Sequence, residues 1–402
     1  MLIFLIIILI SVLLYLYFYK FRQRKAPHIK ELYAEGLDML VSGKHQAAYK
    51  NFKEIVQKDS DNVKAYIRLG QVLREGGNPL QSIKIHKSLL IRKKLTSYEL
   101  IELYKNLSLD YYKINDITKS IEYCIKILEI ENDYEWALHQ LVILYKKNND
   151  WEKATEYLKL YFSKTGKKDI EKLSLYKVQQ AKYKIKENLF EEARLILEKV
   201  LDLKSDSSEA YYFLAKSYSE ESNIEYEKAI KIQKENSTNL SDSKQYNEHL
   251  EEAKKILSKA VPLWVHFAEI DPDQSWLVLP LIKDSLFVLN RFSELENILK
   301  QMYERFPNNV EILASLADYY SHKGEVDKAI SILSSADIKD IDSILIDLIK
   351  IKLELQKDGE NQLIKDLDNS INSFVKNIRY QFSKNSTLKS NMLELLEDEN
   401  NS

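Results

Sequence analysis

The residues that could bind a partner are basic and aromatic side chains that recur at helical spacing between positions 64 and 186. Lysine, arginine and histidine form charge-assisted hydrogen bonds with carboxylates, so a row of them suits an acidic or carboxylate-bearing peptide segment. The candidates are Lys64, Arg68, Arg74, Lys105, Tyr112, Lys113, Trp136, His139, Lys146, Lys147, Lys182 and Lys186. The competing interpretation is a solvated face in a lysine-rich chain, and the sequence leaves both open.

No motif for catalysis accompanies these residues. The seven histidines include no HExxH pair, and the chain has neither a glycine-rich phosphate loop nor a GxSxG nucleophile turn. Cys124 falls at a helix-packing position, where we expect a small buried hydrophobic residue rather than a reactive thiol. We therefore expect a protein with no enzymatic activity, cofactor, bound metal or small-molecule substrate.

The composition predicts a mostly helical chain. Only 8 glycines and 6 prolines occur among 402 residues, which is far fewer than a β-rich or collagen-like chain needs. The single cysteine excludes a disulfide framework and a zinc site built from several thiolates. The formal net charge of −2 gives no overall attraction to nucleic acid, so we expect protein partners.

A sequence period near 34 residues supplies the elements that would position the candidate residues. The clearest unit, residues 310–343, has Leu316, Tyr320, Gly324 and Ala329 at the large and small positions of a helix–turn–helix. Small residues let two helices cross closely, and large residues fill the space between them. Comparable units occupy residues 29–62, 63–96, 101–134, 135–168 and 174–207, with a weaker one at 276–309. The period predicts an all-α tetratricopeptide repeat (TPR) superhelix of about eight repeats over residues 29–343.

In such a superhelix the first helix of each repeat lines the concave face. The candidate residues of the second to fifth repeats would then share one groove. The lysine and asparagine clamp of repeats that bind C-terminal peptides is not reproduced, because Leu109 stands where an asparagine would follow Lys105.

The repeat that begins at Ser208 is interrupted, because its second helix resumes at Ala260, about 33 residues late by the 34-residue period. We expect residues near 223–256 to form a projecting helical hairpin, which is either a tolerated surface insertion or a partner-specific arm. Residues 344–382 should form capping helices broken at Gly359, and residues 383–402 a mobile acidic tail.

The N-terminal residues 1–19 contain no charged side chain and would cover about 28 Å as a helix, close to the thickness of a hydrocarbon core. The basic linker at residues 20–28 follows this stretch, whereas a cleavable signal peptide carries its charge first. We therefore predict an uncleaved transmembrane anchor. The positive-inside rule then gives a single-pass protein of the cytoplasmic (inner) membrane, with its N-terminus outside and its repeats in the cytoplasm.

Local segments resemble the lipopolysaccharide assembly protein B family (LapB, also called YciM). Residues 82–90, followed by Leu95 and Thr96, are similar to the family's A-I-R-I-H-Q-N-L-L … L-T, and residues 150–154 are similar to its D-W-E-K-A. Ala260-x-x-x-Trp264 with the Asp-Pro pair at 271–272 is similar to its A-x-x-x-W … D-P. With the anchor included, the resemblance covers residues 1 to about 382, apart from the insert.

The resemblance implies a cytoplasm-facing adaptor of the inner membrane. Members of this family bring the deacetylase that commits material to lipid A synthesis to the membrane protease FtsH. They end in a rubredoxin-like domain whose Cys-x-x-Cys motifs hold a metal ion. Here Phe382 stands where the first of those cysteines should be and no thiol follows, so we expect the metal-binding domain to be absent.

These features give two hypotheses of function. The first is a membrane-anchored TPR adaptor that holds a peptide or protein client in its groove and presents it to a membrane protease through its anchor. The second is a general structural scaffold for cell-envelope or division complexes, without a role in proteolysis or lipopolysaccharide regulation.

Overall fold

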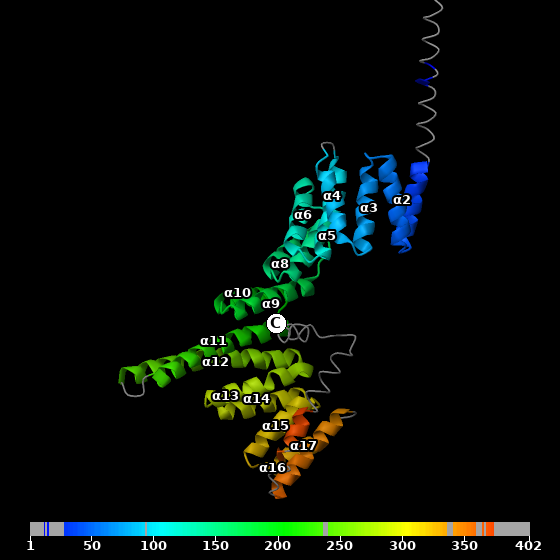
Figure 1. Ribbon diagram of the computed structural model, residues 1–402. Helices are drawn as coiled ribbons and strands as arrows, with labels where there is room; N and C mark the ends of the chain where they lie inside the picture. Colours follow the sequence, from blue (N-terminus) through cyan, green and yellow to red (C-terminus); the bar gives the residue numbers. More distant parts are fainter. Residues whose placement is uncertain are drawn as a thin grey trace, which may run out of the picture. The chain divides into compact units, whose positions relative to one another are not determined.

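The computed structural model describes residues 12, 14–15, 28–92, 95–235, 240–335, 341–358, 364–365 and 367–373. These residues form helices joined by short turns, with no strand among them (Figure 1). The predicted all-α fold is therefore confirmed. The chain divides into two compact units, Met1–Lys168 and Asp169–Ser402, which are considered one at a time.

The first unit is built from helical pairs. A helix at residues 28–41 precedes α2 (His45–Lys58), and the two share one hydrophobic core. The following pairs are α3 (Val63–Glu75) with α4 (Pro79–Leu90), α5 (Ser97–Lys113) with α6 (Ile117–Ile130), and α7 (Glu135–Lys147) with α8 (Trp151–Thr165). The second helix of each pair packs against the first helix of the next pair, and α3 also contacts α5. The first helices α3 and α5 are thereby placed as neighbours.

The second unit continues the same arrangement. It begins with α9 (Ile170–Lys186) and α10 (Phe190–Leu203), followed by the long helices α11 (Ser208–Glu235) and α12 (Leu240–Ile270). The 3-10 helix η1 (Pro272–Leu277) leads to α13 (Leu279–Val288), α14 (Phe292–Arg305), α15 (Val310–His322), α16 (Val326–Ser335) and α17 (Ile341–Asp358). One hydrophobic core extends through this unit, from Val178 on α9 to Leu353 on α17.

The turn inside a helical pair repeats the same backbone conformation along the chain. A residue with φ between 56 and 87° occupies it at Gly43, Gly77, Asn115, Asn149, Asn188, Asn290 and Gly324. Glycine and asparagine adopt this left-handed conformation at the lowest cost, because other residues bring Cβ too close to the following carbonyl oxygen. Gly43 and Gly77 lie 34 positions apart, as do Asn115 and Asn149. The backbone therefore repeats with the period of the sequence.

The small residues that the repeat pattern places on the second helices are all in the core. Ala48, Ser120, Ala154, Ala193, Ala260 and Ala329 are each fully buried. In the weaker repeat at 276–309, Leu295 occupies the equivalent position and is also buried. A small side chain there lets the paired helices approach closely. Because each repeat needs this close approach, small residues recur with the repeat period, and their positions can be predicted from the sequence.

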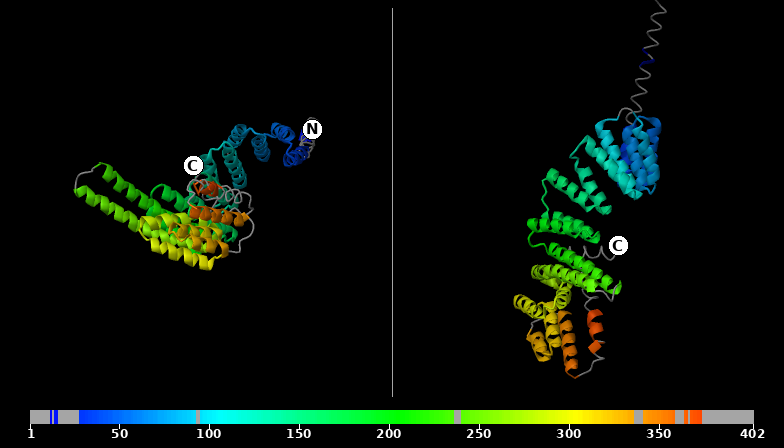
Figure 2. Two further views of the ribbon diagram at one scale, coloured as in Figure 1. Left: turned by 90° about the horizontal axis from the view of Figure 1, so that it is seen from below. Right: turned by 90° about the vertical axis from the view of Figure 1, so that its left-hand side faces the viewer.

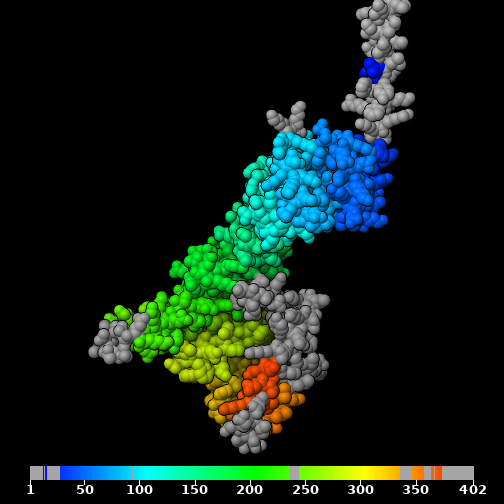
Figure 3. Space-filling view, in the orientation of Figure 1, coloured from blue at the N-terminus to red at the C-terminus, as the bar shows by residue number. Residues whose placement is uncertain are grey.

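The helices α11 and α12 contain 28 and 31 residues, whereas the other labelled α-helices contain 10 to 18. They run side by side and extend beyond the neighbouring helices of the second unit (Figures 1 and 2). The Ser222 hydroxyl donates to the Ala253 carbonyl at 2.7 Å, and Nδ1 of His249 lies 2.8 Å from the Glu225 carboxylate. We call the part of α11 and α12 that extends beyond these neighbours the arm. Figure 3 shows the arm projecting beyond α13 and α14.

Several predicted segments fall outside the described residues. They include nearly all of the anchor at residues 1–19 and of the linker at 20–28, the helix break at Gly359, and the tail at 383–402. Of the anchor, Val12, Leu14 and Tyr15 are described, and all three are helical. In the part of the chain that is described, no helix combines the length and the apolar character needed to span a membrane.

Candidate partner-binding surfaces

Most of the predicted partner-binding residues lie in the first unit, on α3, α5 and α7. The helix starts are fixed by caps: the Asn62 side chain accepts from the Ala65 N–H at the start of α3. At the start of α5, Thr96 and Glu99 form a reciprocal capping box. Such caps satisfy the unpaired N–H groups of the first turn. The caps thus determine where α3 and α5 begin, and so which side chains each helix presents on a given face.

Two lysine–aromatic pairs connect α5 with α7. The Lys105 ammonium on α5 lies 5.3 Å from the centroid of the Trp136 ring on α7. In the opposite direction, Lys147 on α7 lies 4.5 Å from the ring of Tyr112 on α5. Cation–π attraction of this kind stabilises by about 0.5–1 kcal/mol at exposed sites. The structure thus brings together four residues that the sequence had placed in one groove only through the alignment of the repeats.

Three further predicted residues lie on the same two helices and are exposed: Lys113, His139 and Lys146. Lys146 lies 5.8 Å from the Trp151 ring, and the His139 ring lies 5.2 Å from that of Tyr161. We call the seven residues together the α5–α7 surface: Lys105, Tyr112, Lys113, Trp136, His139, Lys146 and Lys147.

The α5–α7 surface is chemically suited to a carboxylate. Aromatic rings hold lysine side chains in place without adding formal negative charge to the surface. Lys105 also lies 3.7 Å from Glu102 one turn earlier on its own helix, a weak and partly exposed ion pair. Four lysines on two adjacent helices therefore give the surface a positive character.

The three predicted residues on α3 differ from one another. Lys64 is exposed, and Arg68 is half-buried and donates to the Gln71 side chain at 2.6 Å. Arg74 is buried, with 8% of its surface exposed. Its Nη1 donates to Oδ1 of Asp110 at 2.9 Å and to the Asn106 side chain at 3.2 Å. Arg74 therefore belongs to the core and not to the predicted groove.

Asp110 is the centre of a buried polar network between α3, α4 and α5. The residue has no exposed surface, and its carboxylate accepts from Arg74 and, at 2.8 Å, from the Ser82 hydroxyl. Nδ1 of His86 lies 2.6 Å from Oδ2 of Asp110, and Nε2 lies 3.1 Å from the Ile67 carbonyl oxygen. Because these polar groups bond to one another and the most exposed of these residues, Arg74, has only 8% of its surface exposed, the network serves to join the second and third repeats.

Gly70 makes room for this network. A Cβ at this position would lie 2.3 Å from Nε2 of His86, well inside van der Waals contact. His86 and Asp110 were not predicted as a pair from the sequence, although His86 lies in the segment that carries the family resemblance. The available signal was Ser82 and His86 one turn apart on one helix face, opposite a helical glycine in the preceding helix.

The last two predicted residues, Lys182 and Lys186, lie on α9 in the second unit. Lys182 is buried, with 2% of its surface exposed, and Lys186 is exposed. Both line a cavity of about 300 Å³ together with residues of α11. We call this cavity the lysine pocket; it is lined by Lys182, Ile185, Lys186, Asn188, Phe213, Lys216 and Glu220.

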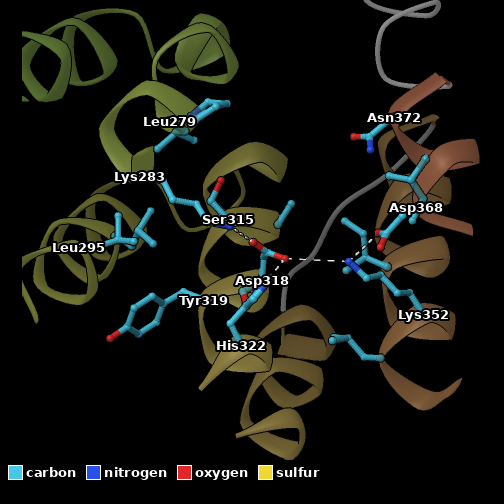
Figure 4. A pocket seen from close by; sticks show the side chains of 16 residues that line it. Leu279, Lys283, Leu295, Ser315, Asp318, Tyr319, His322, Lys352, Asp368 and Asn372 are labelled. Carbon is cyan, nitrogen blue, oxygen red and sulfur yellow. Dashed lines mark hydrogen bonds and ion pairs between the residues drawn. The ribbon is translucent and has the colours of Figure 1, made fainter. Parts of the chain in front are cut away.

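A larger cavity of about 480 Å³ lies among α13, α15, α17 and the helical residues 367–373. Figure 4 shows its charged side chains meeting in a chain. Lys283 donates to Asp318 at 2.6 Å, and Lys352 lies 4.0 Å from Asp318 and 2.6 Å from Asp368. We call this the balanced pocket, because two lysines face two carboxylates.

Cys124 is fully buried on α6, as its helix-packing position predicts. Burial raises the pKa of the Cys124 thiol to about 12, and a hydrogen bond with Ser108 at 3.0 Å offsets little of that. The thiolate that nucleophilic chemistry requires is therefore disfavoured. Within the described ranges, no group of three or more histidine, cysteine, aspartate or glutamate residues could hold a metal ion.

Comparison with known proteins shows a partial likeness to one protein. No protein-family model matches the chain. Lipopolysaccharide assembly protein B of Escherichia coli strain K12 is 26% identical over 136 residues, which are 34% of this chain and 35% of that protein. Over this stretch the chain is similar to LapB. The protein of the same name from Haemophilus influenzae is 23% identical over 130 residues, which are 30% of this chain and 33% of that protein. The LapB-like chain thus matches about a third of the length of these curated relatives.

Solved structures give weaker likenesses. YrrB, described as a TPR protein with an unusual peptide-binding site, is 13% identical, with a TM-score of 0.31 over 56% of this chain and 93% of its own. The TPR2AB domain of yeast Sti1, in a complex described as pHSP90, is 12% identical, with a TM-score of 0.29 over 86% of this chain and 98% of its own. The description of the LapB-like chain as a repeat protein therefore rests on its helical pairs, buried small residues and recurring turns.

Proposed function

We propose that the chain is a TPR adaptor that binds an acidic segment of a client protein on the α5–α7 surface. The observation that carries this proposal is the pair of lysine–aromatic contacts between α5 and α7, at 5.3 and 4.5 Å. The partly exposed rings offer apolar contact area, while the lysines offer charge-assisted hydrogen bonds to carboxylates. This combination suits an acidic peptide segment that also carries apolar side chains.

The proposal places the adaptor at the cytoplasmic face of the inner membrane, held there by residues 1–19. Its support is the uncharged N-terminal stretch with its basic flank and the likeness to LapB. The anchor would bring the client to a membrane complex, for which a membrane protease is the candidate partner. The LapB-like repeats would thus supply the client site, and the anchor the location.

Charge reversal tests the α5–α7 surface. The variant carries Lys105→Glu, Lys113→Glu, Lys146→Glu and Lys147→Glu, and the matched control carries Lys119→Glu, Lys126→Glu, Lys153→Glu and Lys159→Glu on the second helices α6 and α8. Proteins crosslinked to the full chain in intact membranes are then identified by mass spectrometry. We expect the first variant alone to lose a partner that wild type and control retain. Equal recovery by both variants would remove the surface from the proposal, and circular dichroism verifies the helices.

Client turnover separates the adaptor from the general scaffold. Depletion of the chain, or replacement of residues 1–19 by an unrelated membrane anchor, should lengthen the half-life of the captured client if the chain delivers it for proteolysis. Quantitative proteomics after blocking synthesis measures this. If half-lives stay constant while complexes of the envelope fall apart, the scaffold hypothesis is correct and the protease role is wrong.

A further inference from the structure

One face of α5 carries three side chains in a row, which we call the α5 row: Lys105, Leu109 and Lys113. Each lies four positions after the last, and residues at this spacing share one face of a helix. Lys113 is exposed, whereas Lys105 and Leu109 are half-buried. The α5 row therefore has an apolar centre with an ammonium group at each end.

The helix α7 presents the same pattern one repeat later, in a row that we call the α7 row: His139, Ile143 and Lys147. Each of these residues follows its counterpart in the α5 row by 34 positions, and all three are exposed. Ile143 has 37% of its surface exposed, so a partner can reach this apolar side chain. The two rows thus offer apolar contact area at their centres and nitrogen donors at both ends.

The lysine–aromatic contacts join the two rows at both ends. The Lys105 ammonium lies 5.3 Å from the Trp136 ring at one end, and the Lys147 ammonium lies 4.5 Å from the Tyr112 ring at the other. A helical ligand is about 10–12 Å across and would be held off by these contacts. An extended chain is narrow enough to lie along both rows.

The length of the rows matches an extended chain of five residues. From Lys105 to Lys113 the helix rises by about 12 Å. An extended peptide advances by about 3.3 Å per residue, so that its first and fifth residues are about 13 Å apart. Its first, third and fifth side chains also point to the same side. An extended segment with acidic first and fifth residues and an apolar third residue therefore matches both rows.

We infer that the α5–α7 surface selects an extended client segment with an apolar residue at its centre and an acidic residue two positions to either side. This inference rests on the proposed function and specifies which acidic segments bind. The first residues of the two rows contact one carboxylate, the last residues contact the other, and the central residues pack against the apolar side chain. Because Glu102 lies 3.7 Å from Lys105, the end with Lys113 and Lys147 carries the larger positive charge.

Three fluorescent peptides of one composition test the spacing: Glu-Ser-Leu-Ser-Glu, Ser-Glu-Leu-Glu-Ser and Glu-Leu-Ser-Ser-Glu, each flanked by Gly-Ser. Each is titrated against the detergent-solubilised full chain, and anisotropy is recorded. The first peptide should bind about tenfold more tightly than the second, whose carboxylates reach only one end of the rows at a time. It should bind about fivefold more tightly than the third, whose leucine points away from the rows.

Ile143→Ser tests the apolar centre. This variant should bind the first and third peptides equally, because the leucine no longer has its contact on the α7 row. Ile130→Ser on α6 is the matched control, since Ile130 also has 37% of its surface exposed, and it should keep the wild-type preference. A preference that survives Ile143→Ser would overturn the inference.

Lys113→Gln with Lys147→Gln tests the more positive end. The variant should bind the first peptide about tenfold more weakly than wild type, because the hydrogen bonds to one carboxylate lose their charge assistance. Lys119→Gln with Lys159→Gln on the second helices should leave the affinity unchanged. Circular dichroism verifies the helices of every variant.

Equal affinity of wild type for the three peptides would overturn the inference, and the lysine variant then shows how far the failure extends. If Lys113→Gln with Lys147→Gln weakens all three peptides alike, acidic segments bind the surface without a preferred spacing, and the proposed function stands. If this variant changes none of the three affinities, the proposed function fails together with the inference.

Discussion

The buried network around Asp110 and the cluster around Glu296 both pair a carboxylate with cations, but in different surroundings. In the network, Arg74 has the Asp110 carboxylate at 2.9 Å within the same core. In the cluster, the Glu296 carboxylate lies 2.8 Å from Lys300 and 3.1 Å from Lys323, and both lysines are exposed. Breaking a buried pair leaves an uncompensated charge out of water, whereas an exposed pair contributes little because water screens it. The surroundings of the cation, and not the length of the contact, therefore decide what a pair contributes to stability.

The largest expected effect is on the buried side of this comparison. Asp110→Asn removes the counter-charge and leaves the Arg74 guanidinium buried, so we expect a loss of about 3–5 kcal/mol in the stability of the first unit. Hydrogen exchange of the full chain in increasing urea, read by mass spectrometry on peptides from residues 28–168, measures it. The control Asp133→Asn removes an exposed ion pair with Lys164 and should cost less than about 1 kcal/mol. Similar losses in both variants would contradict the assignment.

The next largest loss of stability is expected where a side chain is added beside the network. Gly70→Ala should destabilise the first unit by about 1–3 kcal/mol, because the new Cβ would lie 2.3 Å from Nε2 of His86. The sign of this change in stability is informative. Alanine is the better helix former by about 1 kcal/mol, so a loss of stability has to come from the contact with His86. Gly36→Ala is the comparison variant, because its Cβ would meet the end of the Phe52 ring at 2.9 Å, a milder contact. Equal melting temperatures of the two variants in a thermal scan would indicate that His86 moves aside for the new Cβ, which would contradict this prediction.

Cys124 reports opening of the same unit without a large perturbation. Because burial raises the pKa of its thiol to about 12, we expect a thiol reagent at pH 8 to label native protein very slowly. Asp110→Asn should raise the labelling rate at least tenfold, since a smaller stability leaves the unit open more often. Asp133→Asn should label at the wild-type rate. Rapid labelling of wild-type protein would show that α5 and α6 separate readily.

The smallest effect comes from an exposed cluster that contrasts with Asp110. Hydrogen bonds from Lys300 and Lys323 lower the pKa of Glu296 to about 2. A carboxyl with a lowered folded-state pKa contributes stability above its unfolded value, and loses it as pH falls through about 4.5 towards 2. Because the lysines are solvent-exposed, we expect less than about 1 kcal/mol. Comparing Glu296→Gln with wild type across this pH range should show the two stabilities converging at low pH.

The repeat geometry was predictable because it is encoded locally. Ala154 and Ala329 were identified as crossing positions from spacing alone, and both are buried. The role of Arg74 was not predictable in the same way, because its partner Asp110 lies 36 positions along the chain. Spacing puts Arg74 on a helix face but does not say whether another helix covers that face. The same reason explains why Lys182 was placed with exposed lysines although the fold buries it.

The recurring left-handed turns also have a consequence for how the chain folds. Each closes a pair of helices that are neighbours in sequence, as in the contact between Ser108 and Ser120, 12 positions apart. Such low contact order favours rapid folding that can begin at any repeat. Within the helical pair α11–α12 the separation is larger, because Ser222 meets Ala253 across 31 positions, and closing a longer loop costs more chain entropy. We therefore expect this pair to form more slowly than the shorter helical pairs.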